Sequence, residues 1–99
     1  MIDALSPPTT EAESFRELFA CWPESLPRRG VLVTTQSEAF PFKGFMLKED
    51  MVVLERQNPD TLGVRFILMS FSGISAVRMI DPLKAESFAS LGFEGEFSM

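Results

Sequence analysis

Short apolar segments, separated by polar or turn-forming residues, follow one another closely from Gly30 to about Asp81. Runs of this length, rich in β-branched and aromatic residues, are typical of strands. They predict five strands, over Val31–Thr35, Phe40–Lys48, Met51–Arg56, Val64–Met69 and Ile74–Ile80.

The second of these segments carries two residues that indicate a bent sheet. Gly44 in mid-strand is typical of a bulge or a bend, which is how small barrels turn their corners. Pro41, near the start of the segment, lacks an N–H group and suits a strand end or an edge. The pattern therefore predicts a small, strongly bent antiparallel sheet or barrel.

A different periodicity precedes the strands. Thr10 and Glu13 have the spacing of a capping box, and Pro23 is expected to end the helix that they begin. Four apolar residues follow at i, i+3, i+4 and i+7: Phe15, Leu18, Phe19 and Trp22. A stripe with this spacing favours packing into the core over binding of a cofactor or partner.

These elements divide the chain into three parts. Residues 1–9 are predicted to be a flexible lead-in, residues 10–81 a helix and a barrel, and residues 82–99 a C-terminal tail. Within the tail, Leu83 to Leu91 predicts a short helix. The 99-residue chain is the size of a single domain.

Two of the predicted strands are apolar on both faces. In the fourth strand, Val64, Phe66 and Leu68 are predicted to face the core, and Ile67 and Met69 to face a second cover. The third strand repeats this pattern, with Met51 and Val53 opposite Val52 and Leu54. An exposed antiparallel sheet alternates more cleanly between apolar and polar residues. The second cover is expected to be the N-terminal helix or another subunit.

The charge is distributed unevenly around a net value of −5. Residues 1–24 carry five acids and one base, residues 25–80 five acids and seven bases, and residues 81–99 four acids and one base. A nucleic-acid-binding domain is usually much more basic, and the acidic ends oppose that reading. The single cysteine fits a reducing compartment, and no signal peptide is visible, so a cytoplasmic protein is expected.

Residues that usually carry chemistry are few. The sequence contains no histidine, and its one cysteine, Cys21, is predicted to be a small buried or half-buried filler. Glu49 and Asp50 resemble an acid–base pair, or part of a metal site with Asp60 or Asp81, but adjacent acids in a turn are usually solvated. We therefore expect no catalytic site, no metal and no cofactor.

Three residues give the chain a resemblance to the Sm and Sm-like family of small barrels. Gly44 and Asp50 have the spacing of the Gly and Asp in the family's first motif, and Gly73 matches the Gly of its second motif. The resemblance covers Thr10 to about Ile80. It implies a five-stranded, strongly bent antiparallel SH3-like (Sm-like) barrel. It also implies homo-oligomeric rings in which Val64–Met69 of one subunit pairs with Ile74–Ile80 of the next.

The departures from that family concern RNA. Its Met-Asn pair would fall at Val53-Leu54 and is missing, and the basic residue before Gly73 is replaced by Ser72. The resemblance therefore does not carry RNA binding to this chain. The favoured function is a non-enzymatic, homo-oligomeric scaffold or protein-interaction module. The alternative is a diverged ring that binds single-stranded RNA through basic residues: Arg28, Arg29, Lys43, Arg65 and Arg78.

Overall fold

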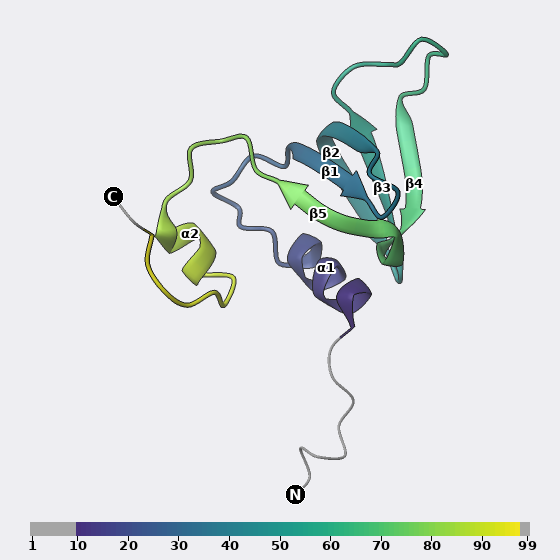
Figure 1. The fold of residues 1–99 in the computed structure, drawn as a ribbon. Helices are drawn as coiled ribbons and strands as arrows, with labels where there is room; N and C mark the ends of the chain where they lie inside the picture. Colours follow the sequence, from purple (N-terminus) through teal and green to yellow (C-terminus); the bar gives the residue numbers. More distant parts are fainter. Residues whose placement is uncertain (1–9, 98–99) are drawn as a thin grey trace, which may run out of the picture.

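A computed structural model describes residues 10–97, so the lead-in predicted for residues 1–9 lies outside the described residues. Two helices flank a five-stranded antiparallel sheet (Figure 1). The elements are α1 (Glu11–Ala20), β1 (Gly30–Thr34), β2 (Ala39–Lys48), β3 (Met51–Arg56), β4 (Phe66–Ser70), the short 3₁₀ helix η2 (Phe71–Gly73), β5 (Ile74–Arg78) and α2 (Ala85–Ala89). The mainly β class, the N-terminal helix and the short helix in the tail are confirmed.

Helix α1 begins where the capping pattern predicts. The hydroxyl of Thr10 accepts a hydrogen bond from the Glu13 N–H at 3.1 Å, which satisfies one of the free donors of the first turn. Glu11 and Glu13 place negative charge near the positive end of the helix dipole. The helix ends at Ala20, and the Cys21 N–H still bonds the Glu17 carbonyl.

The strand order in the sheet is β4-β3-β2-β1-β5, and every neighbouring pair is antiparallel. Strand β3 has the predicted bounds, whereas β4 begins at Phe66, two residues later than predicted. The Asp60 carboxylate explains the delay, because it accepts the N–H groups of Leu62 and Val64 at 2.8 and 2.9 Å. Val64 therefore belongs to the loop.

The connection between β4 and β5 requires the sheet to curve. These strands form its opposite edges, which in a flat five-stranded sheet would lie about 19 Å apart at a spacing of ~4.8 Å per strand. The chain passes from Ser70 to Ile74 through only three residues, which span at most about 14 Å. The two edges therefore approach each other at this end. Within residues 10–97, no ladder joins β4 to β5, and the sheet is open.

Gly44 lies at the bulge that the sequence predicts. The β2–β3 register shifts between Phe42 and Gly44, so that Lys43 is the extra residue. A Cβ at position 44 would lie 3.1 Å from the Glu55 carboxylate oxygen Oε1, so a larger residue there would require this exposed side chain to shift. Because of the bulge, Phe42 and Phe45 both point to the inner face although their spacing is odd.

Helix α1 covers the inner face of the sheet, and Phe19 is the centre of the core. Its side chain is fully buried, and its ring contacts four other aromatic rings, with centroid separations of 4.8 to 6.2 Å. Those rings belong to Trp22, Phe42, Phe45 and Phe71. Edge-to-face and tilted pairs of this kind add to the free energy gained by burying apolar area. The predicted core stripe of α1 is confirmed.

The predicted facing of β4 is wrong. Ile67 and Met69 are half-buried on the inner side, whereas Phe66 and Leu68 are exposed on the outer side. The register explains the facing, because Ile67 lies opposite buried Leu54 and Met69 opposite buried Val52, and cross-strand partners share a face. A strand that is apolar on both sides does not reveal by itself which side is covered.

The central role of Phe19 leads to a prediction about stability. The Phe19→Ala variant should lose about 3–5 kcal/mol of unfolding free energy in urea denaturation, because it leaves a cavity between α1 and the sheet. Phe19→Leu, which fills part of that cavity, should lose less and remain folded. Phe15→Ala, at a half-buried position on the same helix, is the matched control and should lose less than about 2 kcal/mol. Equal losses for Phe19→Ala and Phe15→Ala would contradict this account.

Candidate interaction surface

The outer face of the sheet carries an apolar area that residues 10–97 leave uncovered. The register aligns Met46, Val53 and Leu68 in one row across β2, β3 and β4, with Phe66 and Met51 in the rows beside it. Met46, Phe66 and Leu68 are 73%, 57% and 68% exposed. We call these five residues the outer patch. Contiguous exposed apolar surface of this kind usually marks an interaction site.

A groove of about 390 Å³ lies at the β2 bulge, beside the outer patch. Its lining combines apolar and charged side chains: Arg28, Lys43, Gly44, Phe45, Met46, Val53, Glu55 and Phe66. The guanidinium carbon of Arg28 lies 4.1 Å from the centroid of the Phe45 ring, a cation–π contact. We call this concavity the bulge groove, because the absence of a side chain at Gly44 helps to open it.

The structure brings together only some of the basic residues predicted as nucleic-acid contacts. Arg28 and Lys43 both line the bulge groove. Arg29 is bound to Asp81, and Arg78 lies at the end of β5, the edge strand beyond β1. Arg65 precedes β4, and its carbonyl accepts the Arg56 N–H at 2.8 Å. The five bases therefore do not form one continuous basic surface.

The Arg29–Asp81 ion pair connects the loop before β1 to the segment after β5. The Nε and Nη2 groups of Arg29 both donate to the Asp81 carboxylate. This hydrogen bonding, with the charge of the guanidinium, holds the pKa of Asp81 below its ordinary value and raises the pKa of Arg29. Within residues 10–97 it is the only ion pair closer than 4 Å.

Gly44, Asp50 and Gly73, the three residues that resemble the Sm-like motifs, have roles in the backbone structure. The Asp50 carbonyl accepts the Phe71 N–H at 3.0 Å, and the Gly73 carbonyl accepts the Thr35 N–H at 2.9 Å. These bonds hold the start and the end of η2 against the β2–β3 turn and the end of β1. Together with Gly44 at the bulge, they shape the sheet.

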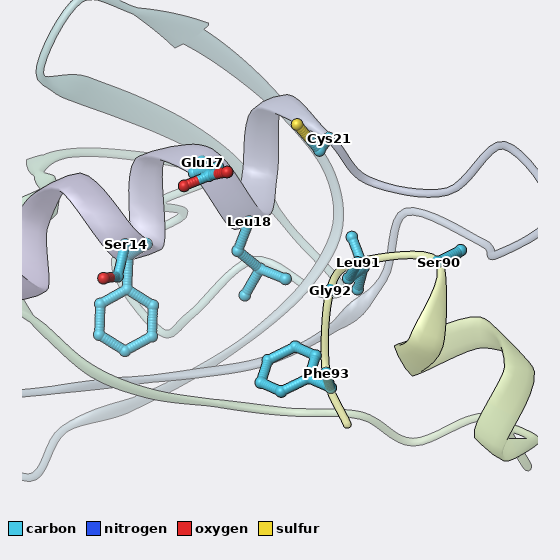
Figure 2. A pocket seen from close by; sticks show the side chains of 9 residues that line it. Ser14, Glu17, Leu18, Cys21, Ser90, Leu91, Gly92 and Phe93 are labelled. Carbon is cyan, nitrogen blue, oxygen red and sulfur yellow. The ribbon is translucent and has the colours of Figure 1, made fainter. Parts of the chain in front are cut away.

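A second concavity, of about 570 Å³, lies between α1 and the tail. Figure 2 shows Glu17, Leu18 and Cys21 on its helix side and Leu91 and Phe93 on its tail side. Cys21 is exposed, so the prediction of a buried or half-buried filler is wrong. Phe19 and Trp22 occupy the side of α1 that faces the core, which leaves position 21 at the uncovered end of the helix.

The two acids considered as an acid–base pair lie outside both concavities. Glu49 and Asp50 are both exposed in the β2–β3 turn and line neither the groove nor the α1–tail concavity. The Glu49 carbonyl accepts a hydrogen bond from the Arg16 side chain. Across residues 10–97, no three Cys, Asp or Glu side chains gather closely enough to hold a metal ion.

The sequence pattern missed the bulge groove, although a signal for it was present. Phe42 and Phe45 are three positions apart, with Gly44 between them. Two large aromatic residues at an odd spacing, interrupted by glycine, indicate that the strand changes its facing at a bulge. If the strand changes its facing at Gly44, Met46 falls on the outer face. The groove then lies at the point where the inward-facing and outward-facing positions of the strand exchange.

Comparison with family models, with curated proteins and with solved structures finds no match to this chain. The Sm-like resemblance therefore stays a prediction. No helix in the described part of the chain is long and apolar enough to cross a membrane.

The Arg29–Asp81 ion pair leads to a prediction about the pKa of Asp81. In a carboxyl-detected NMR titration, Asp81 should titrate below its ordinary pKa of 3.8, and Arg29→Gln should raise that pKa toward 3.8. Because the folded pKa lies below the unfolded pKa, the stabilisation is present above pH 3.8 and is lost as the pH falls through the folded pKa. The stability difference between wild type and Arg29→Gln should therefore narrow in acid. Identical Asp81 titrations in the two proteins would contradict the pairing.

Proposed function

We propose that this protein is a non-enzymatic scaffold or interaction module that assembles with copies of itself through the two edge strands of its sheet. The observation that carries the proposal is β4, an edge strand with apolar side chains on both faces. Natural sheets usually protect such an edge with charges, prolines or a covering element, because an open edge pairs readily with another chain.

The hydrogen bonds of β4 identify the backbone groups that would be available. The Arg65 carbonyl accepts the Arg56 N–H, and the Phe71 N–H donates to the Asp50 carbonyl. Because bonded pairs alternate along an antiparallel ladder, the odd-numbered residues of β4 bond to β3. The backbone N–H and C=O groups of Phe66, Leu68 and Ser70 therefore face away from the sheet.

The second edge offers a partner of the same length. Strands β4 and β5 each contain five residues, and within residues 10–97 β5 pairs only with β1. Pairing β4 of one copy with β5 of the next would continue the sheet from copy to copy. Each added backbone hydrogen bond would contribute about 0.5–1.5 kcal/mol net. The association would also bury apolar side chains of β4 that are now exposed.

The Sm-like resemblance supports the same arrangement. In that family, the fourth strand of one subunit pairs with the fifth strand of the next, and the SH3-like barrel is part of this design. The curvature imposed by η2 and the bulge at Gly44 are consistent with such a barrel. RNA binding remains the second candidate function, and it depends on the two bases at the bulge groove.

Light scattering coupled to size-exclusion chromatography tests the assembly. The wild-type protein should elute as a defined oligomer, and Leu68→Pro should shift it to monomer, because proline removes an outward N–H group of β4. Leu68→Thr is the matched control, since it also shortens the apolar side chain but retains the N–H group. It should weaken association less than proline does.

Circular dichroism should show that both variants keep the fold of the wild type. Proline at an outward-facing edge position does not interrupt the β3–β4 ladder. A wild-type protein that stays monomeric at high concentration would refute the proposed assembly. An oligomer that Leu68→Pro leaves intact would refute the pairing through β4.

A further inference from the structure

The bulge groove carries positive charge that the rest of the described chain does not neutralise. Arg28 and Lys43 line it, and neither forms an ion pair with any residue from 10 to 97. Glu55 is the one acid in the lining, so the groove keeps a net positive charge. Its other lining residues are apolar or glycine, and exposed Met46 and Phe66 extend it into the outer patch. An acidic segment with large apolar side chains would complement this surface.

The tail of the chain contains such a segment. Residues 93–97 read Phe-Glu-Gly-Glu-Phe, and Phe93 and Phe97 are 62% and 65% exposed. Glu94 and Glu96 form no ion pair with the residues from 10 to 97. The two phenylalanine rings contact only Phe88 among the aromatic rings described, with centroid separations of 6.4 and 5.7 Å. This segment, like the groove, therefore has apolar surface and charge without a partner.

We propose that the bulge groove binds residues 93–97 from a second copy of this chain. In an extended conformation, successive side chains alternate between two sides, so Phe93 and Phe97 would point one way and Glu94 and Glu96 the other. The phenylalanines would enter the groove and the outer patch. The glutamates would remain at the rim, within reach of Arg28 and Lys43, whose side chains are long and flexible.

The position of the tail explains why a second copy supplies the segment. Within one chain, the tail lies on the α1 side of the sheet, where Leu91 and Phe93 line a concavity with Leu18 and Cys21. Met46 and Phe66, at the bulge groove, lie on the opposite face of the sheet. A chain whose tail occupied its own groove would have to move that tail from one face to the other. Two or more copies satisfy the same contacts without that movement.

This inference rests on the self-association proposed above but does not require the pairing of β4 with β5. The strand pairing uses outward-facing backbone groups of β4, whereas the docking uses side chains of the bulge groove and the outer patch, to which Phe66 and Leu68 of β4 also contribute. Light scattering reports on the first contact and cross-linking on the second in the full-length protein.

Zero-length carbodiimide cross-linking of a mixture of ¹⁵N-labelled and unlabelled full-length chains tests the proposal. A bond between Lys43 of one chain and Glu94 or Glu96 of another gives a peptide pair that is heavy on one side and light on the other. Mass spectrometry should detect these mixed pairs. Cross-links between Lys43 and Glu55, which line the same groove within one chain, control for the reactivity of Lys43.

Three variants test how much the tail phenylalanines and the groove contribute to the yield of mixed pairs. The double variant Phe93→Ser, Phe97→Ser keeps both glutamates and should lower the yield of mixed pairs by about tenfold, because buried aromatic anchors dominate interfaces of this kind. Phe66→Ser should have a similar effect from the groove side. Leu62→Ser is the matched control, since Leu62 is 87% exposed and lies outside the groove lining, and it should leave the yield unchanged.

The outcomes distinguish this inference from the proposed function. Mixed pairs that persist in Leu68→Pro would support docking of the tail independently of strand pairing. A stable oligomer that gives no mixed pairs would overturn the inference and leave the edge-strand assembly standing. When the labelled and unlabelled chains have been unfolded together and refolded, pairs that are only heavy–heavy or light–light would place the tail in its own groove and overturn the second-copy occupant. Saturable binding of a labelled oligouridine that Lys43→Gln weakens, without mixed pairs, would assign the groove to nucleic acid and also overturn it.

Discussion

The short connection through η2 is the constraint on which the other features of this fold depend. It joins the two outermost strands of a five-stranded sheet with only three residues, and the sheet must curve for those edges to meet. Curvature creates a concave inner face, which a single short helix covers. Phe19 fills the centre of that concavity and makes aromatic contacts with residues from β2, η2 and the segment after α1. The buried core is therefore small and strongly aromatic.

The same constraint accounts for the surface. A helix of ten residues covers one face of the sheet, and the convex face keeps the apolar side chains of three strands exposed. The two edges approach each other at η2 but form no ladder within residues 10–97. A protein built in this way carries apolar surface and unpaired strand edges together, and these are the two features on which the proposed self-association rests.

Much of the fold could be predicted from the sequence because local signals were strong. The capping pattern at Thr10, the stripe through Phe19 and the glycine at position 44 each correspond to a feature that a few neighbouring residues determine. The facing of β4 could not be predicted, because Phe66 and Ile67 are both apolar and only pairing with β3 decides which is covered. The odd spacing of Phe42 and Phe45 indicates where the bulge groove lies, but the contribution of Arg28 could not be predicted, because Arg28 meets Phe45 through tertiary contact between a loop and a strand.

The bulge at Lys43 and Gly44 also decides which side chains of β2 face the core. Before the bulge the even-numbered residues of β2 face the core, and after it the odd-numbered residues do. For this reason Phe45 is buried and Met46 is exposed. If β2 continued past Phe42 as a regular strand with Lys43 kept in the ladder, its two faces would be exchanged from there on, and Phe45 would point outward and Met46 inward. The composition of the outer face thus depends on the way the strand accommodates one extra residue, which most single substitutions elsewhere in β2 would leave unchanged.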